Sequence, residues 1–405
     1  MKILHLLGEV RLPRDPSQEP ASGIVRTALE IARLQASDGY QVTVATAGAV
    51  PWTSSWEGVE LLTLPWWSWA KISVLGRQLD FRLHGAYASR TRTKKYDVIH
   101  AHDYAYFRAL RSQWKIMHFH SDPMYRGVDS SHGAWQPRDF ETVKRAASVV
   151  IAPSQFMKRR LEGAFGEWGG IHVVPNGVDL QIFNPERWSA SRASLRSKWG
   201  VPETSILFFY CGAINALKGV SELTEAFCEV ARRNSSVHLV LAGSSTLWGG
   251  KEGESAYEEH IKHMLEPLYH QGRVRFLGLL PQSSIAEAFQ ACDVAVVPSK
   301  TESFGISALE AQASGRPVIA SRAGALPELV DEMNGVLVDP GDVKQLAAAM
   351  DDLARNPLKR QWLGTNATKA TQAKTWHETY RRVREVYATL STIDSHGRIL
   401  WSKQG

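Results

Sequence analysis

Short apolar runs alternate with longer amphipathic segments along the whole chain, and this alternation restricts the fold more than any other feature. Uninterrupted apolar runs of four to seven residues are typical of parallel strands that are buried on both faces. The intervening segments have the apolar spacing of helices. A first series holds KILHLL, QVTVAT, YDVIHAH, WKIMHFH, SVVIA and IHVVP, and a second holds ILFFYCG, HLVLAG, VRFLG, DVAVVPS, RPVIAS and GVLVD. Two successive series predict an α/β protein with two doubly wound, Rossmann-like domains.

The boundary between the two series lies at Pro175-Asn176-Gly177-Val178-Asp179, which is followed by the polar segment 184–197. We predict a first domain over residues 1–180 and a second over 181–372. The remaining residues, 373–405, contain a helix that we expect to pack back on the first domain. In sheets of this kind the ligand crevice lies at the carboxyl ends of the strands, so the loops that follow the strands are the places to look for a site.

The composition is that of a globular protein that folds in a reducing compartment. Of the 405 residues, 44% are hydrophobic and 22% are charged, and no apolar run approaches the roughly 20 residues that span a bilayer. The opening MKILHLLGEV has the pattern of a first strand rather than of a secretory signal. Cys211, Cys228 and Cys292 are far apart and form no CxxC motif, which excludes a disulfide framework. We therefore expect a cytoplasmic protein.

The formal net charge of +6 is concentrated in one segment. Residues 65–95 contain seven basic residues and one acidic residue, and Trp66, Trp67 and Trp69 stand near the start of this basic segment. Interleaved indoles and cations suit the inner face of an anionic membrane, where the protein would bind peripherally. The alternative is that the tryptophans are core residues and the charges are solvated. Because the excess is local, we expect no nucleic-acid partner.

The segment ESFGISALE, from Glu302 to Glu310, follows the apolar strand DVAVVPS and opens a helix. The backbone N–H groups at such a helix start form an anion site that suits a diphosphate. Glu310 lies about two turns beyond Glu302, so both carboxylates can face one crevice and accept paired hydrogen bonds from vicinal hydroxyls. The alternative is that Glu310 is an ordinary helix residue and that Glu302 only complements the helix dipole.

Two glycine-containing turns are further candidates for phosphate binding. The turn 211–219 follows the first strand of the second series, and Lys218 in it can place an ammonium on phosphate oxygens. In the first series, Ser22-Gly23-Ile24 precedes a helix after a long loop, and a glycine there lets the backbone approach a phosphate. A solvated lysine and a plain helix start are the respective alternatives.

Two His-x-His pairs, His100/His102 and His118/His120, end neighbouring predicted strands. Strand alternation puts each pair on one face of the sheet. Four clustered histidines raise the possibility of zinc, but no cysteine or carboxylate stands at a metal-ligand spacing from them. We therefore predict no metal site, and we expect His118 to be a strand residue that faces helices.

Four elements together resemble the retaining GT-B glycosyltransferases of family 4. They are the boundary segment 175–179, Lys218-Gly219, the Glu302-x7-Glu310 element and PVIASRAGALPELV over 317–330. The resemblance runs from the first strand to the last helix. It implies the GT-B fold, with two Rossmann-like domains facing across a cleft, an acceptor-side first domain and a second domain that binds a nucleotide sugar. It also implies transfer with retention, most often from a UDP-sugar, with GDP and ADP open.

The resemblance assigns roles to residues of this chain. Glu310 would hold the ribose, Lys218 would neutralise phosphate charge, and His120 would contact a hydroxyl of the sugar or the acceptor. The family usually has an arginine where this chain has Ala213. The implied catalytic residues are Lys218, Glu302 and His120, and the implied donor-binding residues are Gly23, Gly212, Ser303, Phe304, Gly305, Ile306 and Glu310.

No Asp-x-Asp motif occurs in the chain, and metal-dependent transferases use such paired acids to hold an ion against the diphosphate. We therefore expect no metal and no cofactor. The expected partners are a nucleotide-sugar donor, a glycan, lipid-linked or small-molecule acceptor, and an anionic membrane. The alternatives are a nucleotide-sugar epimerase or a phosphorylase on the same frame, although a phosphorylase is normally much longer, and a non-catalytic sugar-nucleotide-binding protein.

Overall fold

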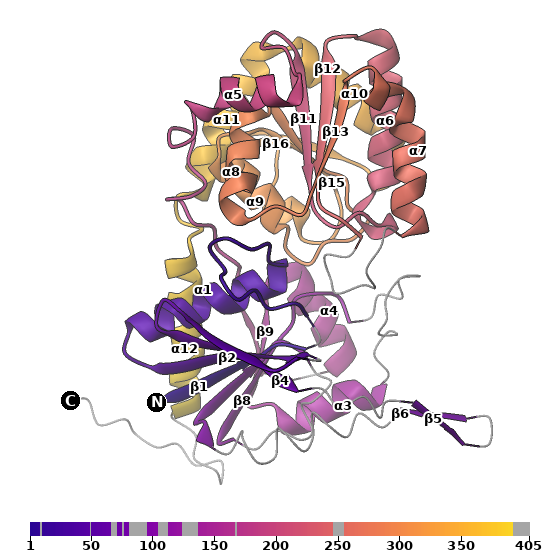
Figure 1. Cartoon of the computed structure of the whole chain (residues 1–405). Coiled ribbons are helices and arrows are strands. Elements are labelled where there is room, and N and C mark those ends of the chain that lie inside the picture. The colour runs from indigo at the N-terminus through magenta and orange to yellow at the C-terminus, as the bar shows by residue number, and fades with distance from the viewer. Residues whose placement is uncertain are drawn as a thin grey trace. The chain divides into compact units, whose positions relative to one another are not determined.

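The computed structural model divides the chain into two compact α/β units (Figure 1). It describes residues 1–8, 10–48, 50–65, 71–74, 77–80, 95–103, 112–123, 137–166, 168–245 and 255–391. Unit 1 comprises Met1–Asp15, Gly23–Pro175 and His377–Gly405, and unit 2 comprises Pro16–Ser22 and Asn176–Trp376. Beyond residue 23, the chain passes from unit 1 to unit 2 at 175–176 and returns to unit 1 at 376–377. The boundaries expected from the sequence are 180–181 and 372–373.

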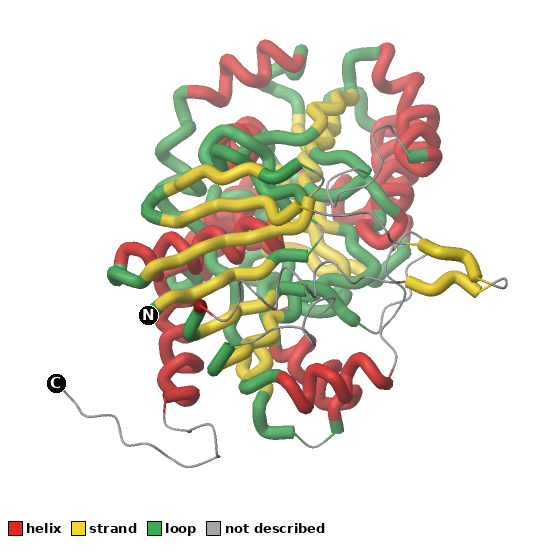
Figure 2. The backbone as a smooth tube through the Cα atoms, turned by 60° about the horizontal axis from the view of Figure 1, so that its bottom comes forward, coloured by secondary structure: helices red, strands yellow, loops and turns green. Residues whose placement is uncertain are grey.

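Unit 1 is built on an eight-stranded sheet in the order β10-β9-β8-β7-β1-β2-β4-β3. All neighbouring strands are parallel except β3 and β4, which form an antiparallel hairpin. The strands lie side by side in Figure 2, with helices packed against them. They are β1 (Lys2–Leu6), β2 (Gln41–Gly48), β3 (Trp52–Trp56), β4 (Val59–Pro65), β7 (Val98–Ala101), β8 (Trp114–His118), β9 (Val149–Ala152) and β10 (Ile171–Val173), and a separate pair is formed by β5 (Lys71–Val74) and β6 (Arg77–Asp80).

The described helices of unit 1 are α1 (Gly23–Ser37), α3 (Pro137–Ala146), α4 (Gln155–Phe165) and α12 (Trp376–Ser391). Apolar side chains of β1, β7 and β8 pack with those of α3 and α4 in one core, which includes Leu6, Ile99 and Met117. Because side chains alternate along a strand, the intervening His5, His100 and His118 lie on the other face. There, α1 and α12 supply hydrogen-bond partners to the histidines.

The C-terminal helix α12 is held to unit 1 by side-chain hydrogen bonds. Tyr380 donates to the Asp38 carboxylate at 2.8 Å, and Thr379 donates to the backbone carbonyl of Pro175 at 2.9 Å. Gln35 of α1 donates to the Tyr387 hydroxyl at 3.2 Å. These contacts lie 204 to 352 residues apart in the sequence.

Unit 2 is built on a six-stranded parallel sheet in the order β13-β12-β11-β14-β15-β16. Its strands are β11 (Ile206–Cys211), β12 (Val237–Ala242), β13 (Val274–Gly278), β14 (Val294–Val297), β15 (Val318–Ser321) and β16 (Gly335–Val338). Its helices are α5 (Ser191–Trp199), α6 (Val220–Arg233), α7 (Ala256–His270), α8 (Gln282–Ala291), α9 (Ile306–Ala313), α10 (Val343–Arg355) and α11 (Pro357–Thr371).

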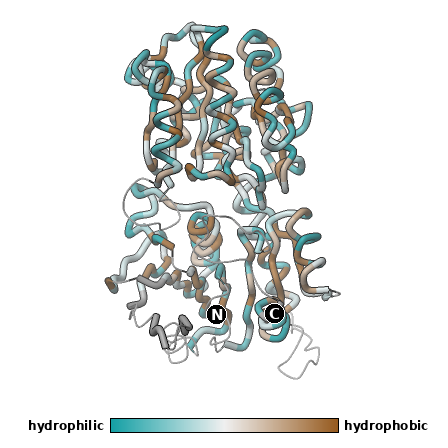
Figure 3. The backbone as a smooth tube through the Cα atoms, turned by 90° about the vertical axis from the view of Figure 1, so that its right-hand side faces the viewer, coloured by the Kyte–Doolittle hydropathy of each residue, from teal (hydrophilic) through white to brown (hydrophobic). Residues whose placement is uncertain are grey.

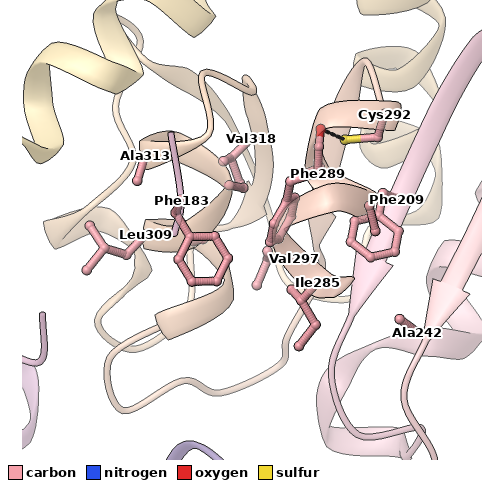
Figure 4. Close-up of a cluster of buried hydrophobic side chains, with 14 of the residues drawn as sticks. Phe183, Phe209, Ala242, Ile285, Phe289, Cys292, Val297, Leu309, Ala313 and Val318 are labelled. Atoms are coloured by element: carbon pink, nitrogen blue, oxygen red, sulfur yellow. Dashed lines mark hydrogen bonds between the residues drawn. The ribbon is translucent and has the colours of Figure 1, made fainter. Parts of the chain in front are cut away.

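Two hydrophobic cores fill the two faces of the unit 2 sheet. One packs the strands against α5, α8 and α9, and the other packs them against α6, α7 and α10 (Figure 1). In the first core, Phe209 and Phe183 both contact the ring of Phe289, with ring centroids 5.1 and 6.3 Å away (Figure 4). Teal and brown segments alternate along the helices in Figure 3, as expected for helices with one buried face.

The two parallel sheets confirm the predicted α/β class with two strand series. The hairpin β3–β4 and the helices α5 and α11 were not predicted. Helix α5 was missed because its most buried position is Arg196, which interrupts the apolar spacing. The tryptophans and most of the basic residues of the basic segment lie outside the described residues. The apolar spacing of residues 107–113 also predicts a helix there, and most of these residues lie outside the described ones as well. In the part of the chain that the structure describes, no helix combines the length and the apolar content needed to cross a bilayer.

Arg196 is fully buried and ties α5 to the strand edge of unit 2. Its guanidinium donates to the Asp293 carboxylate at 3.2 Å and to the backbone carbonyls of Ala291 at 3.0 Å and Pro202 at 2.7 Å. The Asp293 carboxylate in turn accepts from the backbone N–H of Leu207 at 2.7 Å. A buried charge with this many partners cannot be removed without leaving polar groups unpaired.

We predict that Arg196→Ala lowers the free energy of unfolding of unit 2 by about 3–5 kcal/mol, because the Asp293 carboxylate and the backbone carbonyls of three residues lose a buried donor. Urea unfolding followed by circular dichroism measures this. The control is Lys198→Ala, which changes an exposed cation on the same helix. Equal stability of the two variants would show that the Arg196 network contributes nothing.

Candidate functional site

Two loops at the carboxyl edge of the unit 2 sheet bring Lys218 and Glu302 into contact. Lys218 follows β11 and Glu302 follows β14, and these strands are neighbours in the sheet. The Lys218 ammonium donates to Glu302 Oε2 at 2.7 Å, and the Ser299 hydroxyl donates to the same oxygen at 3.2 Å. The side chains of Lys218 and Glu302 are 21% and 12% exposed, so both reach solvent from a partly buried position.

The backbone around Lys218 is fixed by a cap and a glycine. The Asn215 carboxamide oxygen accepts from the backbone N–H of Lys218 at 3.1 Å at the start of η3 (Ala216–Lys218). Gly219 has φ +66°, and a Cβ there would lie 2.0 Å from the carbonyl oxygen of Pro298. Only glycine permits this approach between the two loops, which places Lys218 against the segment that carries Glu302.

Helix α9 begins directly after the Glu302 loop, as the sequence predicts. Gly305 precedes its first residue with φ +100°. A Cβ on Gly305 would lie 2.8 Å from a methyl carbon of Leu326, so the helix start packs closely on the segment after β15. Phe304 is buried and Ser303 is partly exposed. The positive end of the α9 dipole therefore lies at the carboxyl edge of the sheet, beside the Lys218–Glu302 pair.

The turn after β15 supports Glu302 from the other side. The backbone N–H of Ala325 donates to the carbonyl of Glu302 at 2.8 Å. Gly324, with φ +57°, brings its Cα so close that a Cβ would lie 2.0 Å from that carbonyl oxygen. The segment PVIASRAGALPELV, whose pattern predicts a strand, a glycine turn and a short helix, folds as β15, Gly324 and η4 (Leu326–Glu328).

Three further residues lie on elements that belong to the unit 2 sheet or pack on it: Glu310, Gly212 and Ala213. Glu310 lies in α9 and is only 3% exposed. The backbone N–H of Gly212 donates to the carbonyl of Ala242 at 3.0 Å, and its own carbonyl oxygen lies 1.7 Å from where a Cβ on Gly243 would be. Ala213 is buried, and its carbonyl accepts from the Tyr210 hydroxyl at 2.6 Å.

The remaining predicted residues, Gly23 and His120, belong to unit 1. Gly23 is the exposed first residue of α1, and its carbonyl accepts from the Thr27 hydroxyl at 2.9 Å. His120 lies two residues beyond β8 and is partly exposed. His102 Nδ1 and His120 Nε2 are 2.7 Å apart.

A cluster of five histidines fills the α1 and α12 side of the unit 1 sheet. His5 of β1 joins the four that the sequence singled out, and its Nδ1 lies 3.0 Å from Nε2 of His102. Burial lowers the pKa of His5 to about 4 and that of His120 to about 3. Burial also holds the pKa values of His100, His102 and His118 well below the ordinary range. All five are therefore neutral at pH 7.

The ring nitrogens of this histidine cluster are close enough to suggest a metal site. Those of His5, His100 and His102, and those of His102, His118 and His120, lie within 4.8 Å of one another. The bonded nitrogen pairs are 2.7 to 3.1 Å apart. Two nitrogens at 2.0–2.1 Å from one tetrahedral zinc ion would be about 3.3 Å apart. The observed separations are those of N–H···N hydrogen bonds.

Comparison with known proteins identifies the family. The model described as "Glycosyl transferases group 1" matches residues 191–370, and the model described as "Glycosyltransferase Family 4" matches residues 21–182. D-inositol 3-phosphate glycosyltransferase of Xylanimonas cellulosilytica is 30% identical over 402 residues, which cover 92% of this chain and 93% of that protein. The chain belongs to glycosyltransferase family 4. The enzyme of the same description from Corynebacterium diphtheriae is 29% identical, over 74% of this chain and 72% of that protein.

Solved structures of other proteins establish the fold of this family 4 glycosyltransferase. Sucrose-phosphate synthase from Thermosynechococcus elongatus has a TM-score of 0.78 at 22% identity, covering 96% of this chain and 99% of that one. Anabaena Alr3699/HepE in complex with UDP-glucose has a TM-score of 0.74 at 22% identity, covering 96% of this chain and all of that one. Together with the two parallel sheets, these similarities confirm the GT-B fold.

Sequence reasoning identified the residues of this glycosyltransferase that meet at the unit 2 edge, but it missed part of the hydrogen-bonded histidine cluster of unit 1. His5, Gln35 and Tyr387 were not singled out, although they bond to the predicted histidines. A histidine inside the apolar run KILHLL is a visible signal for His5. No comparable signal marks Gln35 or Tyr387, because their histidine partners lie 30 and 287 residues away.

We predict that Gly324→Ala destabilises the protein more than Gly341→Ala, and that it weakens donor binding. Both glycines have positive φ, at +57° and +81°, so both substitutions carry a similar backbone penalty of about 1–2 kcal/mol. Only at Gly324 does the new Cβ meet another atom, the Glu302 carbonyl oxygen, whereas the space around Gly341 is open.

Thermal unfolding and donor titration of the two variants measure this difference. Equal melting temperatures and equal donor affinities would contradict a tight contact between Gly324 and the Glu302 loop.

Proposed function

We propose that this family 4 enzyme transfers a sugar from a UDP-sugar to an acceptor hydroxyl with retention and without a metal ion. The observation that supports it most is the contact of Lys218 with Glu302 beside the N-terminus of α9. A cation, a helix dipole and a carboxylate at one sheet edge suit a diphosphate with hydroxyl groups on both sides of it. HepE, which shares the fold, has been solved with UDP-glucose, and this makes UDP the first nucleotide to test.

In the proposed mechanism, the diphosphate displaces Glu302 as the main partner of Lys218. Negative charge builds up on the diphosphate as the bond to the anomeric carbon breaks. The Lys218 ammonium and the α9 dipole stabilise this charge at the moment when it is largest. A diphosphate oxygen then takes the proton of the incoming hydroxyl on the same face of the sugar, which gives retention. Glu302, released from Lys218, accepts hydrogen bonds from sugar hydroxyls.

Glu310 binds the ribose in this scheme, and His120 of unit 1 accepts a hydrogen bond from a hydroxyl of the sugar or the acceptor. The relatives named D-inositol 3-phosphate glycosyltransferase make that compound the first acceptor to test. Ala213 leaves Lys218 without the arginine that usually follows the glycine at this position. Leaving-group stabilisation therefore depends more heavily on Lys218 than it does in relatives that have the arginine.

We further propose that the enzyme works in the cytoplasm and touches the inner face of the membrane through the basic segment 65–95. No disulfide links Cys211, Cys228 and Cys292, which suits a reducing compartment. Each basic residue near an anionic surface adds about 1 kcal/mol, so seven of them suffice for reversible, salt-sensitive binding.

We predict that Glu310→Ala weakens binding of the free nucleotide by about 1.5–3 kcal/mol, because a buried carboxylate loses its hydrogen bonds to the ribose. Isothermal titration calorimetry measures the affinity. Glu332→Ala, which removes an exposed carboxylate of the same unit, is the control and should bind like the wild type. An unchanged affinity in a folded Glu310→Ala protein would remove Glu310 from the donor site.

We predict that Lys218→Ala lowers kcat at least tenfold, or about 1.4 kcal/mol, and raises KM much less. The reason is that the ammonium acts most strongly on the charge of the transition state. Steady-state kinetics of nucleotide release measures both constants. Lys359→Ala breaks an ion pair of the same 2.7 Å length on helix α11 and serves as the control. If only KM rises, Lys218 binds the ground state and does not act in catalysis.

A further inference from the structure

The five clustered histidines of unit 1 form two hydrogen-bonded chains that both begin at one side chain, the carboxamide of Gln35. Gln35 is 1% exposed, and its two ends bond to different partners. The oxygen lies 2.7 Å from Nε2 of His5, and the amide nitrogen donates to the Tyr387 hydroxyl at 3.2 Å. Because a carboxamide oxygen only accepts and its nitrogen only donates, Gln35 gives each chain a direction.

The first chain runs from Gln35 through His5 and His102 to His120. His5 must carry its proton on Nε2 to donate to the Gln35 oxygen, which leaves Nδ1 of a neutral ring as an acceptor. His102 therefore donates to it from Nε2, across 3.0 Å. The same reasoning makes Nδ1 of His102 the acceptor of the 2.7 Å bond from Nε2 of His120. His120 thus holds its proton on Nε2, and its Nδ1 carries a lone pair.

The second chain runs from Gln35 through Tyr387 and His100 to His118. The Tyr387 hydroxyl accepts from Gln35, so its own proton is available for Nδ1 of His100 at 2.9 Å. His100 then donates from Nε2 to Nδ1 of His118 across 3.1 Å. His118 completes the chain with its proton on Nε2, which is buried and has no hydrogen-bond partner among the residues that the structure describes.

We infer that Gln35 sets the tautomer of all five histidines, so that each carries its proton on Nε2 and His120 presents Nδ1 as a hydrogen-bond acceptor. Neutral rings are required, because a protonated imidazole would donate from both nitrogens and reverse part of a chain. The low pKa values of the five rings meet that requirement. Gln35 is then a positioning residue that acts on His120 through two other side chains.

This inference bears on the reaction only if the proposed function holds, because it is the proposed substrate that brings a hydroxyl to His120. An Nδ1 lone pair accepts a hydrogen bond from a sugar or acceptor hydroxyl, whereas an Nδ1–H would donate to the hydroxyl oxygen and could not accept its proton. His120 is partly exposed, while His5 and His102 of the same chain are buried. The buried part of the chain therefore determines what the exposed ring offers to a ligand.

The first test needs no substrate and no substitution. Nitrogen-15 NMR of the wild-type protein, labelled at histidine, distinguishes protonated from unprotonated ring nitrogens. We expect all five cluster histidines to be neutral, with the proton on Nε2. An Nδ1–H signal for His120, or a charged ring in the cluster at pH 7, would overturn the inference whether or not the protein transfers sugars.

Two variants then separate the two chains. Gln35→Met removes both starting contacts with little change in volume, and it should produce an Nδ1–H form of His120. Tyr387→Phe interrupts only the second chain, so it should change the signals of His100 and His118 and leave His120 as in the wild type. If His120 responds equally to both variants, or to neither, Gln35 does not control it.

Kinetics connects the tautomer to the reaction. Gln35→Met should lower kcat about tenfold through His120, and Tyr387→Phe should leave it within about twofold of the wild type. An altered tautomer with unchanged kcat would disprove the role in catalysis while leaving the tautomer assignment intact.

A titration with Zn²⁺ and Co²⁺ tests the alternative that the histidine cluster is a metal site. Stoichiometric binding that removes the Nε2 protons would show that the cluster is a metal site and would overturn the inference. We expect the ring-nitrogen signals to be unchanged by either ion.

Discussion

The inner strands of each sheet are hydrogen-bonded on both sides and covered by helices on both faces. Charged side chains that reach solvent therefore stand in the loops beyond the strand ends. In unit 2 the strand β14 contains only valine and alanine, and Lys218 and Glu302 stand in the loops after β11 and β14. Two adjacent parallel strands end at the same edge, so residues 84 positions apart meet at 2.7 Å. The candidate donor site is a consequence of this topology.

Close backbone contacts keep that edge in one arrangement. Gly219, Gly305 and Gly324 each stand where a Cβ would collide with a neighbouring loop or side chain. They let the segments after β11, β14 and β15 touch, which restricts the freedom of the Lys218 and Glu302 side chains. Such preorganisation is what electrostatic stabilisation of a leaving group requires, because the cation need not move when the charge develops.

The inner strands of unit 1 are also covered on both faces, but they contain polar side chains within the sheet. Its strands β1, β7 and β8 contain His5, His100 and His118 within the sheet, and all three side chains are fully buried. A buried polar group without a partner is costly, and apart from Nε2 of His118 the ring nitrogens of these three histidines bond to other histidines, to Gln35 or to Tyr387. The helix α12 is therefore needed to complete the polar layer of unit 1.

The features that could be predicted from the sequence are those that depend on the local residue pattern and on where the strands end. The strand series, the start of α9 at Ile306 and the glycine turn at Gly324 all follow from apolar runs and turn residues. The sequence did not predict α5, because the buried Arg196 hides the helical spacing. It also did not predict the hairpin β3–β4, because β3 has the sequence WTSSW and contains no apolar run. Gln35 and Tyr387 were missed because their role depends on contacts that only the folded sheet creates.

The most direct measurement of the central claim is the release of free nucleotide from a panel of UDP-, GDP- and ADP-sugars, with and without D-inositol 3-phosphate and other acceptors. We expect release from a UDP-sugar that depends on an acceptor, persists in EDTA and yields a product with the anomeric configuration of the donor. Tight nucleotide binding without release under any condition would make the protein a binding module. Complete conversion of a donor to an isomeric nucleotide sugar without an acceptor would make it an epimerase, and either result would contradict sugar transfer.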